Sequence, residues 1–241
     1  MRLLAPILAC LVAPALLAGC VGADGRYAES LLQQAAAAQQ SVRSEGIVMR
    51  FTMDADGHSG GVAMEGGAYL KGPNAGDFFM RGNGTGELAL SGEATNFALV
   101  RRAGVVTVHA AGRTENMPVS EADAKFGPDV VDIAKFLDIA QYVKSVSVDE
   151  TTLGGRPADR IVGKLDTSSL LKGVAGFGTQ ALGAAGVHFG DIRAVLFVPH
   201  DTHLVEVMFA DMTITAGGHK GHMHMSVAVN GINKPVSFPT L

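Results

Sequence analysis

The sequence predicts an α+β fold in which helices lie against one face of a curved antiparallel sheet. Short segments of alternating apolar and polar residues recur along the chain, and turns containing Gly, Asn or Asp separate most of them, as in an antiparallel meander. Two other segments have helical spacing. Of the 241 residues, 47% are hydrophobic and 17% are charged. This apolar surplus requires a large core, an internal cavity or an exposed patch.

The N-terminus has the properties of a signal peptide. Arg2 precedes an apolar run that is shorter than the roughly 20 residues needed to span a bilayer, and small residues precede Cys20. Residues 17–20, Leu-Ala-Gly-Cys, resemble the lipobox of bacterial lipoproteins, whose cysteine is acylated. We therefore expect a lipoprotein signal peptide over 1–19, which is removed, lipidation of Cys20, and a linker over 20–26. The alternatives are a signal peptide cut elsewhere and a transmembrane anchor.

The rest of the chain, 27–241, is expected to form a single domain that begins with a helix. This helix is predicted from Tyr27 to Arg43 and is ended by Gly46. Its apolar stripe consists of Leu31, Leu32, Ala35, Ala38 and Val42.

The first predicted strand is Ile47–Met53, in which every second side chain is apolar. Successive side chains of a strand point to opposite faces, so Ile47, Met49, Phe51 and Met53 share one face. Further short strands are expected over 61–65, 68–71, 77–81, 86–90, 96–101 and 105–110.

The second half of the chain is predicted to contain one more helix and five more strands. A helix is expected from Pro128, which suits a first helical position, to Tyr142. Between the later strands, residues 168–190 form an apolar, Gly-rich stretch. The strands themselves are expected over 146–150, 158–165, 192–198, 204–211 and 222–229.

Several segments in this order resemble the LppX/LprA/LprF/LprG lipoprotein family, which has the LolA-like lipoprotein-carrier fold. They are the lipobox with the helix and strand that follow it, Thr152–Ile161, Val195–Leu204, and Ile232–Pro239 with its Lys-Pro-Val sequence. The resemblance implies a curved antiparallel half-barrel sheet with helices covering its concave face. It also implies an apolar cavity between sheet and helices that binds an acylated lipid or lipoglycan.

The residues expected to line this cavity are apolar positions of the predicted strands and of the second helix. Methionine is frequent among them, and its flexible, unbranched side chain adapts to acyl chains. The set comprises Ile47, Met49, Phe51, Met53, Met64, Leu88, Leu90, Ile133, Leu137, Leu196, Met208, Met223, Met225 and Val227.

A gate is expected within 170–186, where apolar side chains alternate with glycines that weaken a rigid element. The alternative is an ordinary long loop packed on the core. The candidate gate residues are Leu170, Leu171, Val174, Phe177 and Leu182.

The sequence lacks the motifs His-Glu-x-x-His and Cys-x-x-Cys. Residues 176–181 have the spacing Gly-x-Gly-x-x-Ala, but no predicted strand precedes them. We therefore expect neither an enzyme nor a cofactor, and the family resemblance implies a bound lipid. A net charge of −4 without a basic cluster argues against a nucleic-acid partner.

His222 and His224 are the basis of an alternative function. Two histidines on one face of a strand can bind copper or zinc, and Met223 and Met225 add soft ligands. We favour plain alternation, with the methionines inside and the histidines in solvent, because no further ligand is evident at strand spacing.

Taken together, these features predict a monomeric lipoprotein held by Cys20 at the outer face of the cell membrane. It would bind acyl chains and carry the lipid across the cell envelope, with an envelope transport partner. The alternatives are a His/Met-rich metal-binding envelope lipoprotein and a structural or interaction lipoprotein with a filled core.

Overall fold

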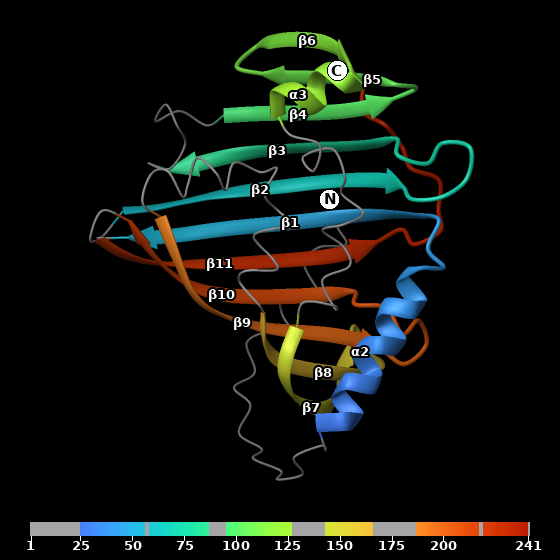
Figure 1. Cartoon of the computed structure of the whole chain (residues 1–241), viewed down its shortest axis with the longest axis vertical. Helices are drawn as coiled ribbons and strands as arrows, with labels where there is room; N and C mark the ends of the chain where they lie inside the picture. Colours follow the sequence, from blue (N-terminus) through green and yellow to red (C-terminus); the bar gives the residue numbers. More distant parts are fainter. Residues whose placement is uncertain are drawn as a thin grey trace.

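The computed structural model describes residues 25–55, 58–86, 95–126, 143–165, 187–216 and 219–240. These residues form one antiparallel sheet of eleven strands (Figure 1). Its strands are β1 (Ser44–Ala55), β2 (His58–Tyr69), β3 (Phe78–Gly86), β4 (Thr95–Arg102), β5 (Val105–Ala110), β6 (Arg113–Pro118), β7 (Val143–Leu153), β8 (Arg156–Leu165), β9 (Val187–Pro199), β10 (Val207–Ala216) and β11 (His219–Asn230).

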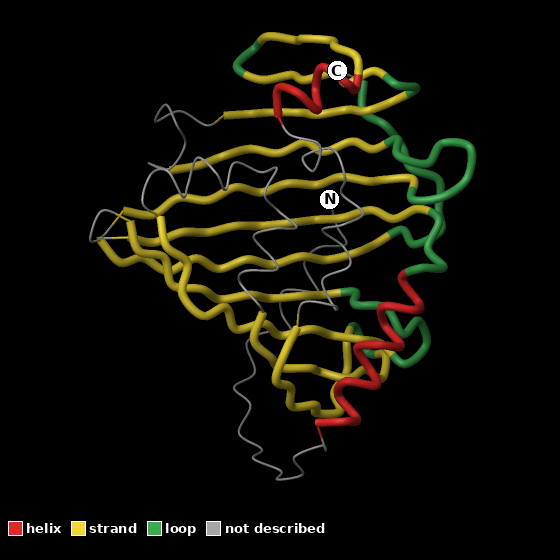
Figure 2. Tube along the Cα trace, viewed as in Figure 1, coloured by secondary structure: helices red, strands yellow, loops and turns green. Residues whose placement is uncertain are grey.

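The order of strands in the sheet is β6-β5-β4-β3-β2-β1-β11-β10-β9-β8-β7. Neighbours in the sheet are therefore consecutive in the sequence, except for the β1–β11 pair, and the consecutive strands β6 and β7 are not paired with each other. The sheet is open, with β6 and β7 at its two ends, and it bends strongly toward the β7 end (Figure 2). The predicted antiparallel α+β architecture is confirmed.

Two helices accompany the sheet in the described part of the chain, α2 (Gly25–Gln39) and α3 (Val119–Phe126). Neither of them is long and apolar enough to cross a membrane.

The register divides the sheet into an inner face, which carries Ile47 and Met49, and an outer face, which carries Val48 and Arg50. On β1, Ile47 and Met49 are buried and Arg50 is exposed. The inner face continues without interruption through paired positions such as Leu196 and Met208. The main hydrophobic cluster of the protein lies on this face.

The two helices pack at opposite ends of the inner face. Leu31 and Leu32 of α2 belong to the main cluster together with Ile161 of β8. Helix α3 packs through Ala122 on Val106 of β5, at the other end. The predicted helix over 128–142 lies outside the described residues, so helical cover over the middle of this face stays a prediction.

Several predicted elements differ from the structure. The first helix ends at Gln39 rather than Arg43, and a turn follows in which the Val42 N–H donates to the Gln39 carbonyl. The two strands expected over 61–65 and 68–71 are one strand, because Gly66 stays paired with Ile47 instead of turning. The sequence analysis also missed β6 and α3.

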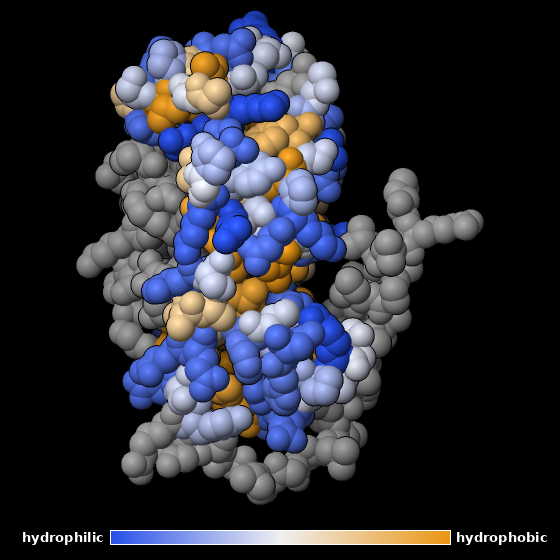
Figure 3. All heavy atoms as spheres, turned by 90° about the vertical axis from the view of Figure 1, so that its right-hand side faces the viewer, coloured by the Kyte–Doolittle hydropathy of each residue, from blue (hydrophilic) through white to orange (hydrophobic). Residues whose placement is uncertain are grey.

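The C-terminal tail runs across one end of the outer face. The Ser44 hydroxyl donates to the Lys234 carbonyl over 2.6 Å, and the Val236 N–H donates to the Tyr69 hydroxyl over 3.0 Å. Phe238 then stacks on Tyr69, with ring centroids 6.2 Å apart. The tail therefore holds the start of β1 and the end of β2, which are paired with each other. On this side of the molecule, hydrophobic side chains show between hydrophilic ones (Figure 3).

Candidate functional site

The middle of the inner face is built from long, flexible apolar side chains on adjacent strands. Across the β1–β11 pair, Met49 faces Val227, Phe51 faces Met225, and Met53 faces Met223. Cross-strand neighbours of this kind have Cβ atoms about 5 Å apart and pack together. The result is a continuous apolar surface at the centre of the sheet.

The register brings together all the predicted lining residues that lie in the described part of the chain. They come from β1, β2, β9, β10 and β11, and all of them are on the inner face. Leu88, Leu90, Ile133 and Leu137 lie outside the described residues. The ten described ones are Ile47, Met49, Phe51, Met53, Met64, Leu196, Met208, Met223, Met225 and Val227.

Methionine is concentrated on this face. The sequence has ten methionines, and every one in the described part of the chain lies on the inner face. Methionine side chains fill irregular space and tolerate partners of different shape, so this surface suits flexible apolar ligands. The described methionines are Met49, Met53, Met64, Met80, Met117, Met208, Met212, Met223 and Met225.

Glycines thin the inner face over β2 and β3. Gly82 is covered, because a Cβ there would lie 2.8 Å from the Met64 side chain and 2.9 Å from the Phe97 ring. Gly84, two residues on, is itself buried, and among the described residues a Cβ there would meet nothing nearer than 4.0 Å. Interior glycines weaken a strand and mark places where something approaches the backbone closely. The inner face therefore has no side chains at these two positions of β3.

Access to the inner face differs along the strands. Ile47 and Met49 are buried, whereas Phe51 and Met53, nearer the other end of β1, are half-buried and pack on the edge of the main cluster. Met64 and Met223, on the strands flanking β1, are half-buried too. A ligand on this face would meet these four side chains with the least rearrangement.

One carboxyl group, missed by the sequence analysis, lies on the inner face. Glu45 is 1% exposed, and burial raises the pKa of its carboxyl. Gln39, at the end of α2, donates from Nε2 to Oε2 of Glu45 over 3.1 Å, which lowers that pKa by a smaller amount. Oε1 has no hydrogen-bond partner. Glu45 is two residues before Ile47, so the alternation that predicts Ile47 on the inner face could also have predicted Glu45 there.

The two histidines of the metal alternative are on the outer face, and Met223 and Met225 are on the inner face. His222 is paired in register with Asp54, and His224 contacts Asp211 through Nδ1. Among residues 25–55, 58–86, 95–126, 143–165, 187–216 and 219–240, no three His, Cys, Asp or Glu side chains are grouped to hold a metal ion. The methionines and histidines therefore cannot share one metal across the sheet.

Two of the segments that resemble the family are joined by an ionic network. Arg156 of the Thr152–Ile161 segment donates to Glu206 and, over 3.2 Å, to Asp201 of the β9–β10 turn. Hydrogen bonding to Glu206 is the main factor that raises the pKa of the Arg156 guanidinium. Thr202 also donates to Glu206, over 2.9 Å. The network fixes the turn beside the start of β8.

The remaining predicted sites lie outside the described residues. They are the lipidated cysteine and the whole gate segment, namely Cys20, Leu170, Leu171, Val174, Phe177 and Leu182.

Comparison with known proteins finds the same fold. No protein-family model matches the sequence, and no curated protein matches it. The structure resembles lipoprotein LppX of Mycobacterium tuberculosis, with a TM-score of 0.50 and 14% identity over 90% of this chain and 100% of that one. It also resembles LprF of Mycobacterium bovis, with a TM-score of 0.52 and 11% identity over 89% and 97%. The chain thus has the fold of LppX and LprF, which confirms the family resemblance seen in its sequence.

Proposed function

We propose that this protein is a lipoprotein that binds the acyl chains of a lipid or lipoglycan on the inner face of its sheet and carries the lipid across the cell envelope. The observation that carries the proposal is the gathering of every described methionine on one face of the sheet. The fold shared with two lipoproteins supports the same function.

Affinity would come from burial of methylene groups. Each methylene removed from water contributes about 0.8 kcal/mol, so a chain of a dozen methylenes offers about 10 kcal/mol before the entropic costs of binding. No chemical step is needed for this, which fits a non-enzymatic carrier.

The proposal includes parts that lie outside the described residues. Acylated Cys20 would hold the protein at the outer face of the cell membrane as a monomer. The helix predicted over 128–142 would cover the middle of the inner face, and 170–186 would open to admit the acyl chains. A partner in the envelope would donate or receive the lipid.

The first test is to identify co-purifying lipid. The Cys20→Ala protein, which carries no acyl anchor of its own, would be analysed by native mass spectrometry and solvent extraction. We expect a bound lipid with acyl chains. Repeated absence of lipid from folded protein would contradict the proposal and favour a structural lipoprotein with a filled core.

A matched pair of variants on β1 locates the site. Met53→Asp changes a half-buried inner residue, and Thr52→Asp changes its exposed outer neighbour. In the Cys20→Ala background, we expect Met53→Asp to weaken binding of a fluorescent fatty acid about tenfold or more, because a carboxylate would have to be desolvated. Thr52→Asp should bind normally. Equal binding by both folded variants would place the lipid elsewhere.

A further inference from the structure

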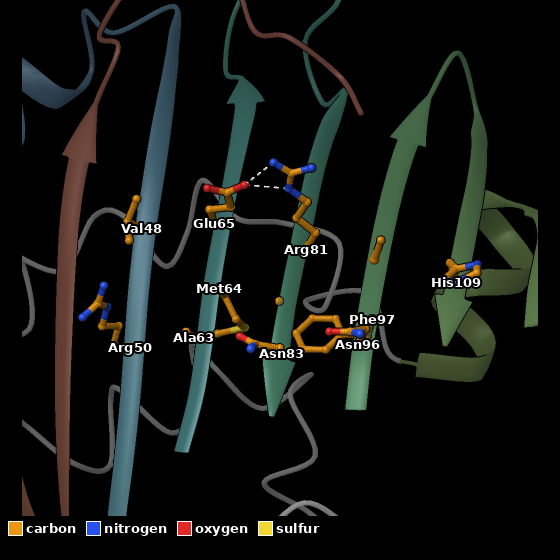
Figure 4. A pocket seen from close by; sticks show the side chains of 12 residues that line it. Val48, Arg50, Ala63, Met64, Glu65, Arg81, Asn83, Asn96, Phe97 and His109 are labelled. Carbon is orange, nitrogen blue, oxygen red and sulfur yellow. Dashed lines mark hydrogen bonds and ion pairs between the residues drawn. The ribbon is translucent and has the colours of Figure 1, made fainter. Parts of the chain in front are cut away.

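The outer face carries a groove that the lipid site does not use. It crosses strands β1 to β5, has a volume of about 500 Å³, and is shown in Figure 4. Most of its lining is on the outer face, where Ala63 and Ala98 have short side chains. Longer polar side chains surround these two residues, so the hollow results from short residues among long ones. Met64, Gly82 and Phe97, which are inner-face positions of the same strands, also line it.

The polar side chains of the groove are arranged by strand register. Arg50 on β1 is paired with Ala63 on β2, Ala63 with Asn83 on β3, and Asn83 with Asn96 on β4. Strands lie about 4.8 Å apart, so Arg50 and Asn83 are separated by roughly 10 Å with only a methyl group between them. A small ligand seated on Ala63 would be within reach of the guanidinium on one side and the two amides on the other.

The charges in the groove leave one cation free. Arg81 donates from Nε to Glu65 over 2.6 Å and so already has a carboxylate partner. His109 is hydrogen-bonded to Thr114 over 2.8 Å. Arg50, by contrast, is exposed and makes no ion pair or hydrogen bond within the described part of the chain. The groove therefore has a local surplus of one positive charge, although the whole chain has a net charge of −4.

We propose that this groove binds a phosphate-type oxyanion over Ala63. The Arg50 guanidinium would donate two parallel hydrogen bonds to its oxygens, the geometry in which arginine recognises phosphate. The amides of Asn83 and Asn96 would donate from the opposite side. The oxyanion belongs either to a free phosphate or to the headgroup of a lipid, since both present the same chemistry.

The test uses the full chain with Cys20→Ala and follows binding of inorganic phosphate by calorimetry at constant ionic strength. Arg50→Gln removes the free cation, and Ala63→Leu fills the seat without changing the charge. We expect both to weaken binding about tenfold or more, because charge-assisted hydrogen bonds are the strong ones. Arg193→Gln is the matched control, since Arg193 is an exposed arginine of the outer face, on β9, away from the groove. It should bind normally.

A second arm identifies the source of the oxyanion. Flotation of the same proteins with phosphatidylcholine vesicles, with and without phosphatidic acid, measures headgroup binding. Association that requires phosphatidic acid and is lost in Arg50→Gln and Ala63→Leu assigns a lipid headgroup, whereas binding of inorganic phosphate alone assigns a free ion. Binding of neither probe, or binding that is the same in the groove variants and in Arg193→Gln, would overturn the proposal. Lipid extraction tests acyl-chain binding on the inner face, whereas phosphate binding tests the groove on the outer face. Either proposal can therefore fail without the other.

Discussion

At the scale of single residues, Glu45 on the inner face opposes the apolar character of its surroundings. Glu45 is almost fully buried and has one carboxyl oxygen without a partner. A buried polar atom without a hydrogen bond costs about 1–3 kcal/mol, and the cost is higher for a charge. The protonated form is therefore favoured in the folded state, as the raised pKa indicates.

This raised pKa makes stability depend on pH. The unfolded chain ionises at the ordinary glutamate pKa of 4.5, and the folded chain at a higher pH. The contribution of protonated Glu45 is therefore fully present below 4.5 and is lost as the pH rises through the folded-state pKa. We expect Glu45→Gln to remove this loss and to stabilise the protein at neutral pH by about 1 kcal/mol.

This prediction is checked by urea unfolding of the unsubstituted protein and of Glu45→Gln, at a series of pH values between acid and neutral. The difference in free energy of unfolding should grow with pH. A difference that does not vary with pH would show that the Glu45 carboxyl ionises alike in both states.

Two glycines on β3 give a second prediction at this scale. A Cβ at Gly82 would lie 2.5 Å from the Ala63 carbonyl oxygen and within 2.9 Å of Phe97, so Gly82→Ala should cost about 1–3 kcal/mol. A Cβ at Gly84 would meet no described atom nearer than 4.0 Å, and Gly84→Ala should be neutral or slightly stabilising, because glycine loses more conformational freedom on folding. Thermal melts of the pair measure the contrast. Equal effects would mean that a Cβ at Gly84 is crowded as closely as one at Gly82.

At the scale of elements, the C-terminal tail has no regular structure but holds the sheet by specific contacts. Phe238 lies against Tyr69 and, at 5.9 Å, against Phe79, and the Arg102 guanidinium lies 5.4 Å from its ring centroid. Gly67 makes room for this packing, since a Cβ there would lie 2.9 Å from Val236. The tail thus ties β2, β3 and β4 together across their ends.

Removal of the Phe238 ring should therefore destabilise the protein. We expect Phe238→Ala to lower the free energy of unfolding by about 1–2 kcal/mol, since aromatic contacts add to the burial of the ring. Ser237→Ala, at an exposed neighbouring position, is the control and should have little effect. If chemical unfolding shows the same stability for both variants, the tail does not hold the sheet.

Elements were predictable from the sequence where side chains alternate. Residues 47–53 have this pattern, and so the face of each of these residues was predicted correctly. Gly66 and Gly67 have no side chains to continue an alternation, so the sequence suggests a turn there although the chain stays extended. β6 is short and mainly polar, and it forms because β5 offers an edge. Cross-strand partners such as Arg50 and Ala63 could not be predicted, because they depend on the register between strands, which the pattern of one sequence does not contain.

At the scale of the whole molecule, the sheet consists of two meanders, β1 to β6 and β7 to β11, that meet at the β1–β11 pair. Within each meander every described pairing is between strands consecutive in sequence. The β1–β11 pair joins residues far apart in the chain, for example Met49 and Val227. Such contacts require closure of a long loop and are slow to form.

Folding kinetics should reflect this arrangement. Val227→Ala removes buried methyl groups at the pair that joins the meanders, and Val106→Ala does so on β5, within one meander. We expect Val227→Ala mainly to slow refolding and Val106→Ala mainly to speed unfolding, since only contacts made in the transition state affect the folding rate. Stopped-flow chevron plots of the two variants, each with its equilibrium stability, measure this.

The pairing of β1 with β11 also constrains the order of events during biosynthesis. A chain made from its N-terminus can form the hairpins of the first meander early, but β1 keeps one unpaired edge until β11, which ends at Asn230, has been made. An unpaired edge invites pairing with another chain. Until β11 has been made, the free edge of β1 in the nascent protein is therefore open to pairing with another chain.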